Sequence, residues 1–437
     1  MRMLPLPTQS RVKPCHSEPP NPWPDCARLP VHAAAVLAAL HLSDPRPELC
    51  AALSAAQWQQ ALDYADRERC TLALRAAVRE RMPEPVRCRV DSDAEKNLVR
   101  LRHIEQTYRD LAAWFAEAGI DFLLLKGITH GGVFGSSSFS RVQYDLDLWL
   151  PRDHAFAARQ FLLERGYEAL PGTEKLPTDH LPALARKTGW QWRGDFFDPE
   201  IPLPVELHFQ FWNQRLDRIS APGVEHFWGR RAPRPLAGTH LPALHPADMV
   251  AYAALHVLKH VLHGSVRVFH VYEIAAMLHA RAGDDAFWSE WLRLHPPALR
   301  RLELLAFQLA HNWFGGDLPP AVEQEASVLP ARLKLWFEEF SASPATQAFH
   351  ANKDELWLHL CLVESRRDAW AIALRRLFPR TLPTAAGDSF VPRKDRWRTW
   401  LQWRVRWALH TLRRAWHHAA ALFATLRSGI RWWRRTH

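Results

Sequence analysis

The chain has 437 residues, of which 48% are hydrophobic and 23% charged. This length and composition allow two or three domains with a buried core, which excludes a disordered or fibrous protein. No uninterrupted apolar run approaches the ~20 residues of a membrane-spanning helix. The cysteines form no C-x-x-C pair, so their spacing favours neither a zinc site nor a disulfide framework; they are Cys15, Cys26, Cys50, Cys70, Cys88 and Cys361.

The net charge of +10 is concentrated at one end of the chain. Residues 393–437 contain twelve basic residues and one acidic residue, Asp395. The other 392 residues hold 44 basic and 45 acidic groups, so they are nearly neutral. A tail of this kind is able to bind an acidic surface independently of the fold.

The chain before residue 119 contains no predicted strand. Residues 1–30 are rich in proline and lack hydrophobic periodicity, which predicts a disordered N-terminus. They also lack the apolar segment of a signal peptide, so we expect a cytoplasmic protein. Residues 31–118 are predicted to be helical, with short helices up to Arg81 and one long amphipathic helix from Asp93 to Gly119.

Over residues 119–235 the hydrophobic periodicity changes, and the pattern becomes that of a small mixed α/β core. Short strands are predicted at Phe122–Leu125 and Tyr144–Leu150, and two more between Gly189 and Trp212. A helix is expected from Asp153 to Arg165. The fold class predicted is therefore α+β, with a small mixed β-sheet core flanked by N-terminal and C-terminal helical regions.

The remainder of the chain returns to helical patterning. We expect a helical domain over residues 236–345 and a helix and linker over residues 346–392. Residues 393–437 form a basic tail rich in tryptophan and arginine.

Two strands of the predicted core carry acidic residues on one face. In Tyr144–Leu150 the leucines alternate with Asp145 and Asp147, which places both carboxylates on one face about 7 Å apart. Glu206 occupies the equivalent face of a later alternating segment, Val205–Phe211. If the two strands are neighbours, three carboxylates converge, and such a set is typical of a site for Mg²⁺ or Mn²⁺.

The segment before these carboxylates has residues suited to binding phosphate. The first strand ends at Lys126 and Gly127, and a loop containing Ser136 and Arg141 follows. A glycine lets backbone N–H groups approach a phosphate, and the side chains supply charge and hydroxyl groups. The loop is not G-x-x-x-x-G-K-[ST], so a P-loop NTPase is not supported.

Taken in order, these motifs resemble the uncharacterised nucleotidyltransferase-like family of the DNA polymerase β nucleotidyltransferase superfamily. The resemblance covers roughly residues 95–290, and its motifs are Leu123-Leu124-Leu125-Lys126-Gly127, Arg141, Asp145-Leu146-Asp147-Leu148, Gly166-Tyr167, Val205-Glu206-Leu207-His208, His245-Pro246-Ala247-Asp248, Leu255-His256, Lys259-His260 and Val271-Tyr272-Glu273-Ile274. It implies that Asp145 and Asp147 bind the metal and that Glu206 completes the catalytic site. It departs from the superfamily where Lys-Gly replaces the usual Gly-Ser or Gly-Gly, and where Trp149 follows on the carboxylate face.

Two functions follow from this pattern. The first is a Mg²⁺-dependent (or Mn²⁺-dependent) two-metal nucleotidyltransferase that moves an NMP group from an NTP to an unknown acceptor, with Lys126, Gly127, Ser136 and Arg141 holding the nucleotide. The alternative is a non-catalytic nucleotide-binding or adaptor module that docks through its basic tail.

Two further clusters have several interpretations. His256, His260 and His263 share a helix face, but the glutamate of H-E-x-x-H is missing, so we expect packing or polar contacts at the domain cleft. The tail over residues 393–437 interleaves tryptophan with arginine. Its interpretations are packing on the body, docking on an anionic membrane surface at the inner face of the membrane, or binding nucleic acid.

Overall fold

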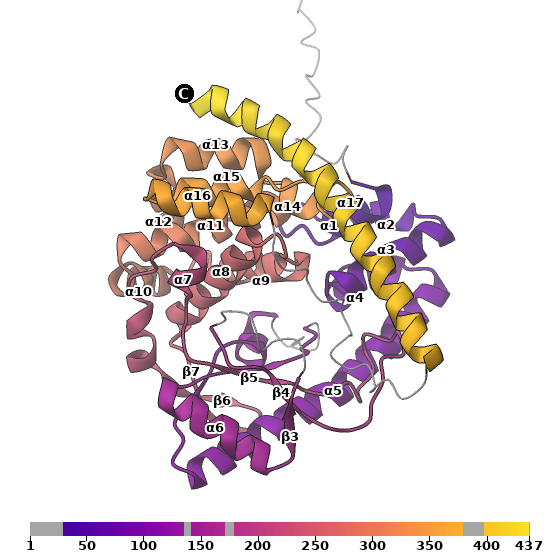
Figure 1. The fold of residues 1–437 in the computed structure, drawn as a ribbon, viewed down its shortest axis with the longest axis vertical. Helices are drawn as coiled ribbons and strands as arrows, with labels where there is room; N and C mark the ends of the chain where they lie inside the picture. The colour runs from indigo at the N-terminus through magenta and orange to yellow at the C-terminus, as the bar shows by residue number, and fades with distance from the viewer. Residues whose placement is uncertain (1–28, 135–140, 171–178, 379–396, 437) are drawn as a thin grey trace, which may run out of the picture.

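The computed structural model describes residues 29–134, 141–170, 179–378 and 397–436. A layer of helices occupies one half of the molecule, and a mixed β-sheet with two long flanking helices occupies the other (Figure 1). This confirms the predicted α+β class. Ser136 lies outside the described residues.

The sheet has seven strands in the order β3-β4-β5-β2-β1-β7-β6. β2 and β5 at its centre are parallel, as are β1 and β7, and the other pairs are antiparallel. The strands are β1 (Leu123–Leu124), β2 (Leu146–Trp149), β3 (Tyr167–Ala169), β4 (Leu184–Arg186), β5 (Val205–His208), β6 (Ala232–Leu236) and β7 (Thr239–Ala243).

One face of the sheet packs on α5 (Glu84–Glu117) and α6 (Arg152–Glu164). Leu146 and Leu148 of β2 and Leu207 of β5 point into this layer and are fully or almost fully buried. Because side chains alternate along a strand, Asp147 and Glu206 point to the other face, towards the helical layer. The leucine alternation in the sequence therefore fixes which face carries the acids.

The helical layer combines segments from both ends of the chain in one hydrophobic core. Its N-terminal members are α1 (Val31–Ala39), α2 (Glu48–Ala51), α3 (Ala55–Arg67), α4 (Thr71–Val78) and the 3-10 turn η2 (Arg79–Arg81). Its later members are α8 (Pro246–Leu262), α9 (Val268–Ala280), α10 (Asp285–Leu294), α11 (Pro297–Phe314), α12 (Pro320–Ser327), α13 (Ala331–Phe340), α14 (Ser343–Thr346), α15 (Glu355–Leu362) and α16 (Arg366–Leu377).

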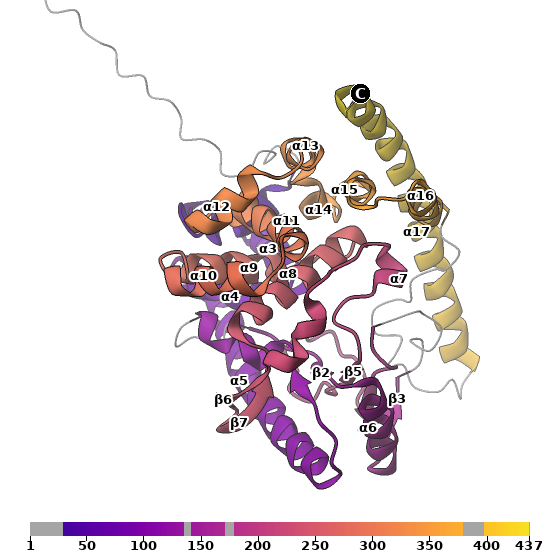
Figure 2. The ribbon, with the colours of Figure 1, turned by 90° about the vertical axis from the view of Figure 1, so that its left-hand side faces the viewer.

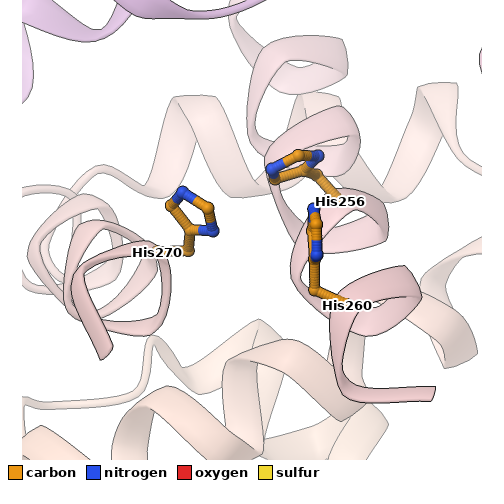
Figure 3. Close-up of side chains that lie close together, drawn as sticks. All are labelled: His256, His260 and His270. Atoms are coloured by element: carbon orange, nitrogen blue, oxygen red, sulfur yellow. The ribbon is translucent and has the colours of Figure 1, made fainter. Parts of the chain in front are cut away.

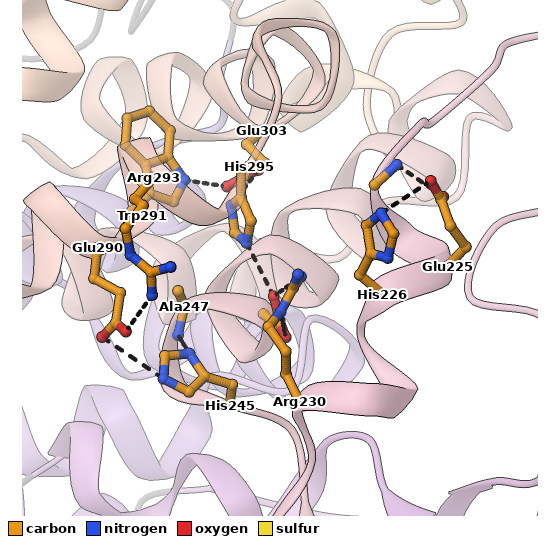
Figure 4. Close-up of polar contacts among 12 residues, drawn as sticks. Glu225, His226, Arg230, His245, Ala247, Glu290, Trp291, Arg293, His295 and Glu303 are labelled. Carbon is orange, nitrogen blue, oxygen red and sulfur yellow. Dashed lines mark hydrogen bonds and ion pairs between the residues drawn. The ribbon is translucent and has the colours of Figure 1, made fainter.

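Short segments connect the two layers. They are η3 (Gly127–Phe134), α7 (Gln214–Asp217), η5 (Val224–His226) and η6 (Trp228–Arg230). At η6, Arg230 donates to both oxygens of the buried Asp248 of α8, at 2.8 and 2.7 Å. His295 lies between Asp248 (3.0 Å) and Glu303 (2.9 Å) and is fully buried (Figure 4). This network ties the connecting segment to α8 and α11.

The C-terminal helix α17 (Trp397–Thr436) runs along one side of the molecule, beside α15 and α16 (Figures 1 and 2). Ser428 of α17 donates to Asp354 at 2.6 Å and accepts from the Trp357 indole at 3.1 Å. A side chain at Gly429 would lie 2.5 Å from the Trp357 ring, so glycine permits this close approach. One side of α17 is therefore held by the body.

Several predicted elements differ from the observed ones. The long helix begins at Glu84, directly after Pro83, rather than at Asp93. No strand lies between residues 189 and 204 of the described chain, and β4 is at Leu184–Arg186 instead. The sheet also continues to Ala243 through the β6–β7 hairpin, beyond the expected core boundary at residue 235.

Candidate functional site

The parallel pairing of β2 with β5 builds the centre of the site. Its register places Asp147 beside Glu206 and Leu148 beside Leu207. The two acids therefore share the face that the leucines leave free. The alternation in the two segments predicted that these acids would lie side by side if the strands were neighbours.

Asp147 is almost completely buried, with 1% of its side chain exposed. Its Oδ1 atom accepts from Lys126 Nζ at 3.2 Å and from His208 Nε2 at 3.1 Å. Burial alone would raise the pKa of Asp147, but Lys126 and His208 outweigh it and lower that pKa. Asp147 is therefore ionised, and its carboxylate is paired with two cationic side chains.

His208 lies close to three carboxylates, those of Asp147, Glu206 and Asp179, which we call the acidic cluster. Its Nε2 atom also lies 3.5 Å from Glu206 Oε2, and its Nδ1 atom lies 3.8 Å from Asp179 Oδ2. Burial opposes a charged imidazole, but the hydrogen bonds that His208 donates to Asp147 and Glu206, together with the charge of Asp179, raise the pKa of His208 to about 9. His208 thus carries a proton at neutral pH and compensates the buried carboxylates.

Asp179 joins this cluster to the helical layer. Both of its oxygens accept from Lys259 Nζ of α8 at 2.8 Å. Burial raises the pKa of Asp179, but His208 and Lys259 outweigh it and bring that pKa below its usual range. No sequence pattern indicated Asp179, because it lies outside the alternating strands and comes close to His208 only in the folded chain.

A cavity of about 370 Å³ opens between this face of the sheet and helices α8 and α9. Asp145, Glu206, His208, Lys126, Arg141 and Lys259 are among its lining residues. Asp147 does not line it, because Lys126 and His208 cover its carboxylate. The cavity therefore has acidic and basic side chains close together, a combination suited to a metal ion and a phosphorylated ligand.

Arg141 connects the sheet wall to α9. Its Nε atom donates to Glu273 Oε1 at 2.7 Å, and His130 Nδ1 lies 3.0 Å from the same oxygen. Burial raises the pKa of Glu273, but Arg141 and His130 outweigh it and hold that pKa well below its usual range. The guanidinium is thus anchored to Glu273 through Nε, and Arg141 lines the cavity.

Gly127 does not line this cavity. Its φ of +81° lies in the left-handed region, and a Cβ there would be 2.5 Å from the Gln143 side chain. Gln143 Nε2 in turn donates to the backbone oxygen of Asp145 at 2.7 Å. Gly127 therefore shapes the support beneath Asp145, and it lines a neighbouring pocket rather than the cavity that Lys126 lines.

Asp147, Glu206 and His208 each offer a donor atom, and these atoms lie within 4.8 Å of one another. Two carboxylates beside an open cavity suit Mg²⁺ or Mn²⁺, which prefer oxygen ligands. Asp145 lines the same cavity but lies outside this tight cluster.

A family model described as "Uncharacterised nucleotidyltransferase" matches residues 54–315. The chain belongs to this family. No curated protein and no solved structure matches it. The family assignment supports a general role in nucleotidyl transfer with a nucleotide as substrate.

The part of the chain matched to the nucleotidyltransferase family runs from the start of α3 to the end of α11. It contains every residue that lines the cavity, from Arg69 to Glu273. It starts earlier than the predicted resemblance and so includes Arg69, which lies between α3 and α4 and lines the cavity. Helices α12 to α17 lie outside the matched region.

Proposed function

We propose that the protein is a Mg²⁺-dependent nucleotidyltransferase that moves an NMP group from an NTP to an acceptor. The observation that carries the proposal is the β2–β5 register, which brings Asp147 and Glu206 together beside a charged cavity. The class of acceptor stays open between a hydroxyl, a phosphate and an amine.

The carboxylates suit a pair of divalent ions. Asp145, Asp147 and Glu206 would hold them, since their oxygens are the ligands that Mg²⁺ prefers. The proton of His208 and the charge of Lys126 now compensate this cluster, so the pocket already stabilises positive charge. When bound, the ions would supply activation of the attacking oxygen and neutralisation of the pyrophosphate.

The cationic side chains would hold the triphosphate. Lys126 would turn from Asp147 to the phosphates, and Arg141 would present its guanidinium while Glu273 fixes its position. The acceptor atom would attack the α-phosphorus, the bond to the β-phosphate oxygen would break, and pyrophosphate would leave with that electron pair. Catalysis would come from positioning and charge, with no covalent enzyme intermediate.

The test is nucleotide turnover by the purified full chain. It would be incubated with each α-labelled NTP, Mg²⁺ or Mn²⁺, and fractionated acceptor pools, with label transfer and pyrophosphate release as readouts. Asp147→Asn and Glu206→Gln should each lower turnover on the order of 10²-fold or more. Glu168→Gln on β3, an exposed acid of the same sheet, is the matched control and should stay active.

The adaptor alternative has a different outcome. If the chain binds NTP but no pool is labelled, and Asp147→Asn supports cell function as well as wild type, the enzyme proposal fails. Nucleotide binding without turnover would then favour the adaptor module.

A second proposal concerns α17, which we expect to dock on an anionic membrane surface at the cytoplasmic face. Large apolar side chains recur on it at spacings of three, four and seven residues, which form one helix face. Between 51% and 79% of each of these side chains is exposed, and they make up the apolar stripe of α17: Val405, Leu409, Leu412, Trp416, Phe423, Leu426, Ile430 and Trp433.

Exposed arginines flank the apolar stripe, namely Arg413, Arg427, Arg431 and Arg434. No helix among the described residues is both long enough and apolar enough to cross a bilayer. An apolar face beside arginines is typical of a helix lying in the interface of an anionic membrane. Most of the stripe is aliphatic and has no ring on which a base would stack, so it favours lipid over nucleic acid.

Co-sedimentation of the full chain with vesicles tests this surface. Binding to phosphatidylcholine vesicles containing phosphatidylserine should exceed binding to phosphatidylcholine alone. Leu412→Asp combined with Phe423→Asp should abolish it, whereas Trp192→Asp, at an exposed tryptophan outside α17, should not. Wild-type protein that stays in the supernatant at low salt would overturn the proposal, and so would binding to single-stranded nucleic acid alone.

A further inference from the structure

Three histidines face one another on the helical wall of the cavity. His256 and His260 are one turn apart on α8, and His270 faces them from α9 (Figure 3). Their ring centroids lie 4.5, 5.0 and 5.7 Å apart. His263, which the sequence grouped with the first two, instead pairs with Asp217 at 2.7 Å. We call His256, His260 and His270 the histidine triad.

The triad is uncharged at neutral pH. Burial, followed by the charge of Lys126 for two of the rings, lowers the pKa of His260 to about 3 and that of His256 well below its usual value. Burial, followed by His260, has the same effect on the pKa of His270. Neutral imidazoles keep a lone pair on one ring nitrogen, which is the form that coordinates metals.

The local contacts leave ring nitrogens for a ligand. His260 Nδ1 lies 3.0 Å from Ser265 Oγ, a contact that orients the ring and leaves Nε2 for another partner. His270 Nδ1 is buried and has no hydrogen-bond partner within the described part of the chain. A buried lone pair without a partner is costly, and it points to a ligand that completes the triad.

We infer that His256, His260 and His270 bind a transition-metal ion of the zinc class. Each residue offers a nitrogen, and these atoms lie within 4.8 Å of one another. A tetrahedral Zn²⁺ site has Zn–N bonds of about 2.0–2.1 Å, so modest ring rotations would bring the nitrogens together. Three imidazoles suit zinc rather than Mg²⁺, which prefers oxygen.

The ion would have an open fourth position. Three protein ligands are the pattern of zinc sites that keep one position for water or substrate. All three rings line the same cavity as Glu206 and Asp145, so a substrate oxygen in the cavity would be able to complete the coordination. Arg69, Lys126 and Lys259 also line the cavity and oppose a cation, so an anionic ligand at the fourth position should strengthen binding.

Metal titration without nucleotide tests the histidine triad separately from nucleotidyl transfer. The chelator-treated full chain would be titrated with Zn²⁺ by calorimetry and with Co²⁺ by visible absorption. We expect one Zn²⁺ ion to bind tightly per chain. Bound Co²⁺ should give the intense visible absorption of a tetrahedral site. The sequence has 24 histidines, so the decisive quantity is the difference between wild type and variant.

His270→Gln and His260→Asn should each weaken the binding of this ion at least about tenfold. Asp147→Asn should retain it, which separates the triad from the acidic site. His240→Asn, at an exposed histidine of β7, is the matched control. Circular dichroism and metal-free melting temperatures would confirm that each variant is folded. Unchanged Zn²⁺ affinity in both folded triad variants, or no tightly bound Zn²⁺ in wild type, would overturn the inference.

Discussion

Arg141 Nε donates to Glu273 Oε1 at 2.7 Å, and this pair joins the sheet to helix α9 across the wall of the cavity. Only 12% of the Arg141 side chain and 6% of the Glu273 side chain are exposed. A pair buried to this extent contributes through position as much as through charge, since it fixes the guanidinium at the site where phosphates are expected.

Glu273→Ala leaves the buried charge of Arg141 without its partner and should lower the free energy of unfolding by about 3–5 kcal/mol. Adding Arg141→Leu should recover part of the loss, because the uncompensated charge is removed. Denaturant unfolding of the single and double variants measures this coupling, and strictly additive losses would contradict it.

Lys126→Met should tighten the binding of Mn²⁺ in the absence of nucleotide. Lys126 covers Asp147 at 3.2 Å and competes with a metal for the same oxygen. The same change should raise the KM for NTP, because a phosphate-binding charge is lost. Electron paramagnetic resonance of free Mn²⁺ gives the affinity. A weaker Mn²⁺ affinity would show that Lys126 and the metal do not compete.

Gly127→Ala and Gly166→Ala form a matched pair. Both glycines have a φ of +81°, but only the Cβ at Gly127 would meet another side chain, that of Gln143 at 2.5 Å. The backbone conformation alone should cost roughly 1–2 kcal/mol of unfolding free energy in each variant. Gly127→Ala should lose about 1–3 kcal/mol more. Equal losses in chemical denaturation would refute the role of the Gln143 contact.

The buried His295 gives a pH-dependent stability. Burial opposes its charge, but Glu303 and Asp248 outweigh it and raise the pKa of His295 to about 9, against 6.5 as the ordinary value. A raised pKa adds stability that is complete below pH 6.5 and is lost as the pH rises through about 9. His295→Gln should therefore lower the free energy of unfolding on the order of 2–3 kcal/mol at pH 6.

That difference from wild type should shrink as the pH approaches 9.5. His226→Gln is the control, since His226 lies near Glu225 on the exposed surface (Figure 4). A pH-independent difference for His295→Gln would mean that the imidazole is neutral in the folded protein.

The alternation of leucine and acid was sufficient to predict which face of the sheet carries Asp147 and Glu206. It was sufficient because a period of two leaves only one arrangement once the leucines are buried. The alternation did not predict that Asp179 and His130 belong to the site. Their partners are more than 25 residues away in the chain and come close only through packing.

The strand β6 shows a second limit. Pro233 and Pro235 argue against a strand, because proline donates no hydrogen bond to a neighbour. β6 is the last strand of the sheet and needs only one neighbour, so its prolines are tolerated. Whether a strand lies at the edge is known only from the assembled sheet. The sequence therefore did not predict β6, and the sheet extends beyond the expected core boundary at residue 235.

We propose that Asp147 and Glu206, with Asp145, hold divalent metal together with an NTP. The most direct test is an anomalous difference map from crystals of the full chain grown with Mn²⁺ and a non-hydrolysable NTP analogue. We expect a Mn²⁺ peak between the Asp147 and Glu206 carboxylates, with the triphosphate beside Lys126 and Arg141. An ordered analogue in the cavity with no Mn²⁺ at these carboxylates would contradict it.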